Sequence, residues 1–297
     1  MNQLKSLFMT AYMMMTMIVS AFAAWMIYRH GMSPAWVGVM LTTAPALLFL
    51  IGTMLLQNTA HTRRYLPLPS LLALAGAGMA GWQPIVQSGP LLPFALAIAG
   101  WMGLLLYIHW YSHFGREPSL RLVTGARLPE FEVRDLEGKP VSSASFAGKP
   151  AVLVFYRGNW CPFCMAQVRQ LAARYRELEA MGVRVILISP QPYAKNAQLA
   201  KRFDVNMEFL VDDGNVAARI LELDQRNGLP MGMQVMGYDS ETVLPTVIVT
   251  DANGKVIWVH ETDSYRIRPE PDTYLEVLRI NKLAPGTDAA ALMPSHA

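Results

Sequence analysis

Residues 151–164 read AVLVFYRGNWCPFC, and this stretch decides the fold of the second half of the chain. It begins with an uninterrupted apolar run, which is typical of a strand buried on both faces of a sheet. A turn at Arg157-Gly158-Asn159 follows, and an amphipathic segment then extends from Cys161 to about residue 180. The pattern therefore predicts a buried strand that leads through a short turn into a helix.

Both cysteines of the chain lie in this stretch, at Cys161 and Cys164. If Cys161 is the N-cap and Pro162 takes the first helical position, Cys164 lies one turn later on the same face, with the Cβ atoms about 5–6 Å apart. A small adjustment then allows a disulfide. The amides of the first helical turn and the helix dipole also stabilise a thiolate. The arrangement favours a redox dithiol in which one sulfur attacks and the other resolves.

Three other interpretations of the cysteine pair are weaker. A structural disulfide here closes a loop too short to add much stability, and a cytoplasmic location disfavours it. Zinc needs about four ligands, and the chain has no second cysteine pair. Inert buried cysteines are not expected as a CxxC pair directly after a strand. We predict no metal and no other cofactor.

The segments on both sides of this stretch alternate between short strands and helices, which is typical of an α/β layer. Strands are expected in a hairpin at 131–134 and 141, and at 183–189, 208–211, 246–250 and 256–260. The tight turn Asp251-Ala252-Asn253-Gly254 makes the last two an antiparallel pair. Helical segments are expected at 194–203, 215–221 and 271–283.

The first 115 residues have a different composition. Only 16% of the whole chain is charged, compared with about 25% in ordinary globular domains. Before Arg116 the charged side chains are Lys5, Arg29, Arg63 and Arg64, whereas the other 21 basic and all 22 acidic residues follow. Because the C-terminal part is nearly neutral, the charge pattern argues against a nucleic-acid partner.

Four apolar stretches in this first part are long enough to cross a membrane. Hydrocarbon about 30 Å thick needs roughly 20 apolar residues in helical form. The stretches cover residues 7–28, 34–56, 66–86 and 91–113. The third is rich in glycine and alanine, which let membrane helices approach closely. Two polar or irregular segments complete the organisation, a predicted linker at 116–127 and a predicted disordered tail at 284–297.

The positions of the cations predict the orientation, because short cytoplasmic loops retain Lys and Arg. With the N-terminus inside, Lys5, the Arg63-Arg64 pair and Arg116 are cytoplasmic, and only Arg29 lies outside. The expected protein is a multi-pass inner-membrane protein whose C-terminal domain faces the cytoplasm. If the first apolar run is instead a signal peptide cleaved after Ala21-Phe22-Ala23, three spans remain and the C-terminal domain still lies inside.

The C-terminal part also resembles a known family. The stretches LPEFEVRDLEGKPVSSASFAGKPAVLVFYRGNWCPFC (128–164) and VLPTVIVTDANGKVIW (243–258) are similar to the thioredoxin-fold superfamily, specifically its AhpC/TSA, peroxiredoxin-like branch. The resemblance covers about residues 125–283 and implies a central sheet flanked by helices. The expected fold class is thus an N-terminal α-helical transmembrane bundle followed by an α/β thioredoxin-like domain at 128–283.

The resemblance implies roles for the site residues and leaves the attacking sulfur open. By thioredoxin logic Cys161 attacks and Cys164 resolves. If the motif is instead aligned with the peroxiredoxin pattern from Phe155-Tyr156, Cys164 takes the position of the peroxidatic cysteine, and Cys161 stands where those enzymes usually have Thr. Pro245 matches the family's cis-proline, which faces the CxxC motif and receives substrate backbone.

An arginine beside the thiolate is also expected, and the sequence offers Arg157, Arg219 and Arg226 as candidates. We favour Arg157 for its nearness to the cysteines. Trp160 either shields the pair or only packs. The predicted site is therefore catalytic Cys161 and Cys164 with substrate-binding Pro245, Trp160 and Arg157.

These features imply a membrane-anchored thiol peroxidase that reduces a small hydroperoxide through a dithiol–disulfide cycle. A thiol reductant such as a thioredoxin or glutathione system would regenerate it, and the lipid bilayer is the other expected partner. One alternative is a thiol-disulfide oxidoreductase that acts on a disulfide of a protein partner. A third is an assembly or scaffold protein whose bundle binds a membrane partner and whose redox domain only docks.

Overall fold

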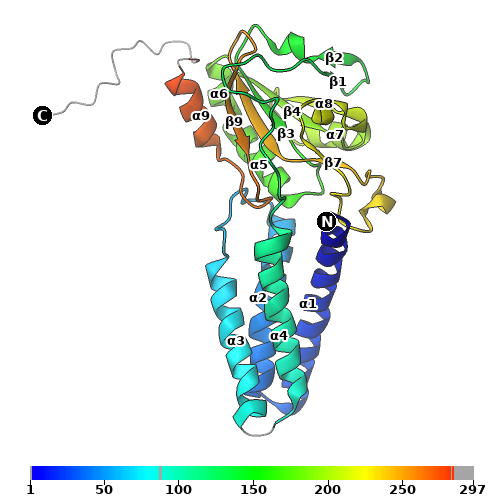
Figure 1. Ribbon diagram of the computed structural model, residues 1–297, viewed down its shortest axis with the longest axis vertical. Helices are drawn as coiled ribbons and strands as arrows, with labels where there is room; N and C mark the ends of the chain where they lie inside the picture. Colours follow the sequence, from blue (N-terminus) through cyan, green and yellow to red (C-terminus); the bar gives the residue numbers. More distant parts are fainter. Residues whose placement is uncertain (1, 87–88, 282, 284–297) are drawn as a thin grey trace, which may run out of the picture.

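The computed structural model describes residues 2–86, 89–281 and 283, so the predicted tail at 284–297 lies outside the described residues. It consists of a bundle of long helices with an α/β domain seated on one end (Figure 1). The N-terminus lies at the end of the bundle nearest the domain, and the chain returns to that end before it enters the domain (Figure 1).

The bundle contains a helix at each of the four predicted apolar stretches. These are α1 (Asn2–His30), α2 (Pro34–Leu56), α3 (Pro67–Val86) and α4 (Leu91–Leu106), which continues as a π-helical turn over Tyr107–Tyr111. Within the described part of the chain, three helical segments are long and apolar enough to cross a membrane: Asn2–His30, Pro34–Leu56 and Leu91–Tyr111. That α3 also crosses the membrane stays a prediction.

Glycine allows α2 and α3 to pack closely. A Cβ atom on Gly76 would lie 2.5 Å from the carbonyl oxygen of Gly38 and 2.8 Å from Cβ of Leu41, so only glycine fits there. Gly78 has no neighbouring atom within 4 Å of an added Cβ. The glycine-rich character of α3 is therefore explained at Gly76 and not at Gly78.

The domain is built on a seven-stranded sheet with the order β2-β1-β5-β4-β3-β8-β9. The central strands β3, β4 and β5 are parallel, whereas β8, β9, β1 and β2 join the sheet antiparallel to their neighbours. This sheet contains every strand predicted from the sequence. The strands are β1 (Glu132–Arg134), β2 (Pro140–Ser142), β3 (Ala151–Phe155), β4 (Arg184–Ser189), β5 (Glu208–Val211), β8 (Thr246–Thr250) and β9 (Val256–Glu261). A separate pair, β6 (Asp224–Gln225) and β7 (Thr242–Val243), was not predicted.

Helices cover both faces of the sheet. Buried residues of α5, α6 and α9 belong to the hydrophobic cluster on one face, and residues of α8 belong to the cluster on the other. The helix predicted over 161–180 is interrupted at Arg174, whose φ of −106° and ψ of 8° are not helical. The helices are α5 (Pro162–Ala173), α6 (Tyr175–Ala180), α7 (Tyr193–Ala200), α8 (Val216–Ile220) and α9 (Pro271–Ile280), with short 3-10 turns at Ser143–Phe146, Asp213–Asn215 and Met233–Met236.

The segment predicted as a linker, 116–127, is docked on the domain. Arg116 forms an ion pair with Glu261, with Nη2 and Oε1 2.5 Å apart. Leu122 is buried in the same hydrophobic cluster as Phe131. Arg116, Ser119 and Leu122 thus attach the segment to the domain, whereas most of its other side chains are exposed.

A buried arginine holds the bundle to the domain. Arg266 follows β9 and is only 1% exposed. Its guanidinium donates hydrogen bonds to Ser112 Oγ at 2.8 Å and Thr62 Oγ1 at 3.0 Å, and to the carbonyls of Arg63 and Arg64 at 3.2 and 2.8 Å. These acceptors lie at the ends of α2 to α4 that face the domain, so one side chain ties the ends of three helices to the sheet.

The first turns of α1 make a second set of contacts to the domain. Three polar side chains spaced four residues apart lie on one face of this helix and donate hydrogen bonds to carbonyls of a single loop. The pairs are Asn2 to Arg226 at 2.7 Å, Ser6 to Leu229 at 2.6 Å and Thr10 to Met231 at 3.2 Å. The bundle and the domain therefore form one packed unit.

Candidate redox site between the bundle and the domain

The cysteine pair lies at the N-terminus of α5, as predicted. Cys161 is the N-cap with φ −87° and ψ 110°, and Pro162 takes the first helical position. Cys164 follows one turn later, and both cysteines are reduced and buried. The site lies on the side of the domain that meets the helical bundle (Figure 1).

The turn before the cysteines has a fixed conformation. Gly158 has φ +144°, and a Cβ atom there would lie 2.8 Å from the Trp160 ring. The backbone N–H of Asn159 donates to Gln191 Oε1 at 2.7 Å, and the Gln191 amide in turn donates to Asn196 at 2.6 Å. This network positions the Trp160 ring and the start of α5.

Arg157 lies beside the cysteine pair, and one N–H group of its guanidinium forms no hydrogen bond among the described residues. Its side chain is 6% exposed, and the guanidinium carbon lies 4.6 Å from the centre of the Trp160 ring. The Nη2 group donates to the carbonyl of Gly228. Its Nε has no hydrogen-bond partner among the described residues. A buried N–H donor without a partner costs free energy, which suits it to an oxygen of a ligand.

Arg268, which sequence reasoning missed, is a second cation at the site. It is 1% exposed, and its Nη1 donates to the carbonyls of Ser264 and Ile267 at 3.2 and 3.3 Å. Among the described residues its Nε and Nη2 have no partner and no carboxylate forms an ion pair with it. Its uncompensated charge favours the ionised form of both cysteines.

The two thiols have opposite acidities. Burial by itself raises the pKa of Cys161, but hydrogen bonds from the thiol and the backbone N–H of Cys164, together with Arg157 and Arg268, outweigh burial and lower this pKa to about 6. The pKa of Cys164 is raised well above its usual value by burial and by the neighbouring Cys161. At neutral pH Cys161 is the thiolate and Cys164 keeps its proton.

An apolar cavity of about 310 Å³ opens beside Cys161. Trp160, Pro162 and Arg157 line it from the domain, and residues of α1 and α2 complete its wall. Cys164 is not among the lining residues. Cys161 is therefore the sulfur that faces the cavity, and Cys164 lies behind it.

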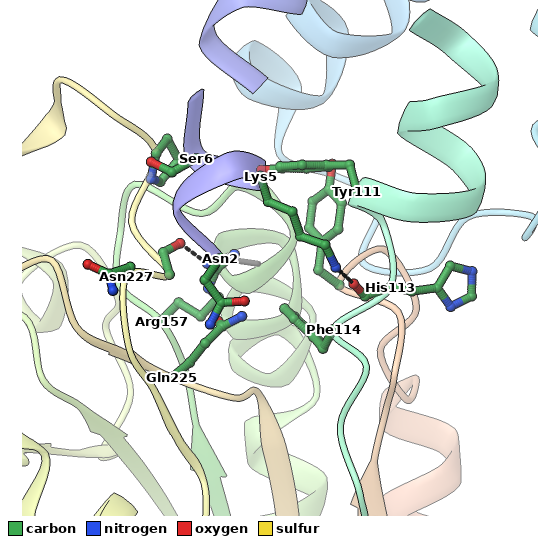
Figure 2. A pocket seen from close by; sticks show the side chains of 12 residues that line it. Asn2, Lys5, Ser6, Tyr111, His113, Phe114, Arg157, Gln225 and Asn227 are labelled. Carbon is green, nitrogen blue, oxygen red and sulfur yellow. Dashed lines mark hydrogen bonds between the residues drawn. The ribbon is translucent and has the colours of Figure 1, made fainter. Parts of the chain in front are cut away.

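A second, smaller cavity, lined mostly by polar residues, also borders Arg157. Figure 2 shows Asn2, Lys5 and Ser6 of α1 beside Arg157 and Gln225 of the domain. This cavity has a volume of about 20 Å³, which is room for roughly one water molecule. Arg157 lines both cavities, together with Tyr111, Pro230 and Tyr265.

Phe163, the residue between Pro162 and Cys164, links the motif to the bundle. Its ring meets that of Tyr265 edge-on, with the centroids 5.2 Å apart. The hydroxyl of Tyr265 is hydrogen-bonded to that of Tyr107 at 2.5 Å, at the end of α4. The cysteine motif and the helical bundle thus share one continuous hydrophobic cluster.

The structure corrects the prediction for Pro245. No cis peptide bond occurs among the described residues, so the Leu244–Pro245 bond is trans. The chain continues here from β7 into β8: the N–H of Leu244 donates to the Leu223 carbonyl at 2.7 Å, and the Pro245 carbonyl accepts from Arg116 at 3.3 Å. Pro245 is buried and does not line the cavity at Cys161.

Two of the three candidate arginines lie away from the site. Arg219 pairs with Glu241 at 2.6 Å, and Arg226 lies 3.7 Å from the same carboxylate with 77% of its side chain exposed. Neither lines the cavity at Cys161. Arg157, the favoured candidate, does line it, as does Trp160.

Comparison with known proteins identifies the domain. Residues 124–259 match the AhpC/TSA family. Peroxiredoxin Q from the chloroplasts of Sedum lineare is 32% identical over 95 residues, which is 32% of this chain and 51% of that protein. The corresponding protein of Triticum aestivum is 35% identical over 91 residues, which is 31% of this chain and 42% of that protein. The chain thus spans about half the length of these plant relatives.

Other relatives differ in name and in coverage. The thiol-disulfide oxidoreductase ResA of Bacillus cereus is 26% identical over 184 residues, which is 61% of this chain and 90% of that protein. Among solved structures, the peroxidoxin BcpB of Mycobacterium tuberculosis is 24% identical, with a TM-score of 0.44 over 55% of this chain and 98% of that one. The predicted family and fold class, a peroxiredoxin-like thioredoxin fold behind apolar helices, are confirmed.

Proposed function

We propose that this chain, whose residues 124–259 form an AhpC/TSA domain, is a membrane-anchored thiol peroxidase in which Cys161 attacks the peroxide and Cys164 resolves. The observation that carries the proposal is that the two thiols differ in pKa and in access to the cavity. Cys161 has a pKa lowered to about 6 and faces a cavity, whereas Cys164 has a raised pKa and lies behind it. An attacking thiol needs the thiolate form and access, and only Cys161 has both.

The reaction proceeds in two steps. The Cys161 thiolate attacks the terminal oxygen of the hydroperoxide, the O–O bond breaks, and the alkoxide leaves as an alcohol once it takes up a proton. Cys161 is then a sulfenic acid. The Cys164 sulfur attacks the Cys161 sulfur and displaces the hydroxyl, which leaves with a proton as water. Two thiols are oxidised to one disulfide, and one hydroperoxide is reduced to an alcohol and water.

The two arginines have separate roles in this proposal. Arg157 lines the cavity, and its buried Nε has no hydrogen-bond partner among the described residues. We expect this guanidinium to donate to a peroxide oxygen and to stabilise the charge that develops on the leaving oxygen. Arg268 acts through the sulfur, because its charge favours the Cys161 thiolate. Arg157 is thus proposed as a substrate-binding residue and Arg268 as a positioning residue.

The position in the membrane is also a proposal. The three apolar helices support a multi-pass anchor. The start of α1 and the loop between α2 and α3 lie at the end of the bundle that carries the domain (Figure 1), and these segments contain Lys5, Arg63 and Arg64. Arg29 lies at the opposite end of α1. Because cytoplasmic loops retain cations, we place the redox domain on the cytoplasmic side of the inner membrane.

Exchange with a protein disulfide is the second candidate, and the relative named as a thiol-disulfide oxidoreductase favours it. The access to the cysteines argues against it. Cys161 is 1% exposed and lies under the membrane helices and the 226–240 loop, so a folded protein does not reach its sulfur in this conformation. For the same reason we expect a small thiol of the glutathione class, rather than a thioredoxin, to regenerate the dithiol.

The test compares the two activities on the reduced full-length protein in vesicles. We expect hydrogen peroxide to oxidise both thiols with a stoichiometry of one peroxide per protein, and we expect a disulfide-bonded protein such as insulin to be reduced slowly. Cys161→Ser should abolish the peroxide reaction. Oxidation by peroxide no faster than that of a free thiol, together with rapid reduction of insulin, would establish disulfide exchange instead.

A further inference from the structure

One loop of the domain exposes large apolar side chains beside the bundle. Residues 227–238 read NGLPMGMQVMGY and contain no charged side chain. This apolar loop lies between β6 and β7 and includes the 3-10 turn Met233–Met236. Val235 is 91% exposed, Met236 56% and Met231 49%. Large apolar side chains that gather on a surface mark a contact with another molecule or with a membrane.

The first turns of α1 fix the position of the apolar loop. Ser6 donates to the Leu229 carbonyl at 2.6 Å, and Thr10 donates to the Met231 carbonyl at 3.2 Å. Figure 1 shows the loop, in yellow, next to the start of α1. From Leu229 to Met231 the chain therefore runs along the helix, over the rise of about 6 Å that separates Ser6 from Thr10, away from the domain.

The position of Thr10 along α1 gives the level of the loop relative to the membrane. Helix α1 has 29 residues, whereas hydrocarbon about 30 Å thick needs roughly 20. Arg29 lies in the last turn of α1 and belongs outside the hydrocarbon. A span of roughly 20 residues that ends before Arg29 begins near residue 9. Thr10 and the Met231 carbonyl that it bonds therefore lie where α1 enters the hydrocarbon.

The cavity beside Cys161 gives the same level independently. Met231 and Met233 of the apolar loop line it together with Met13 and Met14 of α1, which follow residue 9. The inner side of the loop thus reaches the apolar span of α1. Val235 and Met236 are not among the residues that line this cavity, and their exposure places them on the outer side of the loop.

The outer surface of α1 continues the apolar surface of the loop. Leu4 is 67% exposed and Leu7 is 51% exposed, and both line a groove of about 450 Å³ with Met231. A soluble partner would have to cover these side chains at the level of the lipid head groups. The bilayer surrounds α1 at this level, so lipid is the contact that the position of the loop favours.

We propose that the apolar loop 227–238 enters the membrane interface and that Val235 and Met236 contact acyl chains. The inference goes beyond the proposed peroxidase and rests on the proposed position of the bundle in the membrane. Segments that lie in this interface bury their apolar side about 5–10 Å into the boundary between head groups and acyl chains. Because the Gly228 carbonyl accepts from Arg157, the lipid contact also holds the segment that positions this arginine.

The experiment measures the depth of single spin labels on the full-length protein in phosphatidylcholine vesicles. The background is the double variant Cys161→Ser/Cys164→Ser, so that only an introduced cysteine takes the nitroxide label. Val235→Cys and Met236→Cys place the label on the loop. Both side chains are exposed, so the substitutions remove no core contact.

Two further positions serve as matched controls. Val216→Cys places the label on α8 of the domain, at a side chain that is 49% exposed, and reports water. Met17→Cys places it within the apolar span of α1, at a side chain that is 54% exposed, and reports lipid. The readout is the rate at which each label collides with oxygen, which concentrates among acyl chains, and with a water-soluble nickel chelate.

We expect collisions with oxygen to exceed those with nickel at positions 235 and 236, at a depth of about 5–10 Å, and the reverse at position 216. Labels at 235 and 236 that meet nickel as often as the label at 216 overturn the lipid contact. Labels shielded from both reagents also overturn it, because they show a contact with protein. Exposure to nickel at position 17 overturns the membrane position and, with it, this inference. None of these results depends on the thiols, so the peroxidase is tested separately by the reaction with hydrogen peroxide.

Discussion

The buried Arg268 offers the sharpest test of how the site acidifies Cys161, through the substitution Arg268→Met. The pKa of Cys161 is about 6 against an ordinary value of 9.0, a difference of three units. Each unit corresponds to about 1.4 kcal/mol, so the surroundings favour the thiolate by about 4 kcal/mol. Hydrogen bonds from Cys164 and the charges of Arg157 and Arg268 share this stabilisation after they have overcome the cost of burial.

A neighbouring opposite charge lowers an acidic pKa by about 1–3 units, so we expect Arg268→Met to raise that of Cys161 by about 1–2 units. At pH 7 the thiolate fraction then falls from about 90% to between about 50% and 10%. The free energy of unfolding should not fall, because methionine has a similar shape and removes a buried charge that has no carboxylate partner. In the variant, the Cys161 thiol should be less acidic, and the free energy of unfolding should stay the same or rise.

The assay is the rate of alkylation of Cys161 by iodoacetamide as a function of pH, on the full-length protein in detergent, with the labelled peptide identified by mass. Arg279→Met is the control, because it removes an equal charge from an exposed position on α9. An unchanged midpoint in Arg268→Met, or an equal shift in Arg279→Met, would refute the role assigned to Arg268. Thermal unfolding of the same samples checks the stability.

Three further predictions concern the turn, the junction and the effect of pH. Gly158→Ala should destabilise the protein by about 1–3 kcal/mol in thermal unfolding, because φ is +144° and the new Cβ meets the Trp160 ring. Gly138→Ala is the control: the space around Gly138 is open, so the loss of free energy of unfolding should be smaller. Arg266→Met removes four hydrogen bonds between the bundle and the domain. Amide hydrogen exchange in the 58–66 loop should therefore accelerate, while exchange in β3 stays slow. Equal exchange rates in the variant and the wild type would contradict the role of Arg266 in joining the two parts. The reduced protein should gain stability as pH rises from 6 to 9, by at most about 4 kcal/mol, because the pKa of Cys161 is lowered on folding and its contribution is lost as pH falls through 6. In denaturant unfolding, the free energy of unfolding of Cys161→Ser should change less with pH than that of the wild type.

Local patterns were sufficient to predict the centre of the domain. The apolar run at 151–155, the turn at Gly158 and the Cys161-Pro162 start of α5 have sequence signals that no distant contact alters. The β8–β9 pair was equally predictable from the turn at 251–254. The break at Arg174 and the two-residue strands β6 and β7 carry no such signal, because tertiary contacts determine them.

The parts of the site that sequence reasoning missed come from distant segments. Arg266 and Arg268 lie in a short polar stretch after β9, and only the packed structure shows that both are buried. The polar face of α1 was visible in principle, since Asn2, Ser6 and Thr10 recur every four residues in an otherwise apolar helix. That spacing is the sequence signal for a helix that docks on a polar loop.

The trans peptide at Pro245 shows the limit of a motif match. The sequence Leu244-Pro245-Thr246 resembles the family pattern, but the isomer of an X-Pro bond depends on its surroundings. Here the backbone bonds of Leu244 and Pro245 to Leu223 and Arg116 hold the chain extended between two strands.

The most direct test of the account is to identify the sulfur that carries oxygen after one turnover. Reduced Cys164→Ser protein in vesicles is mixed with one equivalent of hydrogen peroxide in the presence of dimedone, and the modified peptide is sequenced by mass spectrometry. The account predicts a dimedone adduct on Cys161, formed faster than on a free thiol. An adduct on Cys164 in the Cys161→Ser protein, with none on Cys161 in the Cys164→Ser protein, would contradict it.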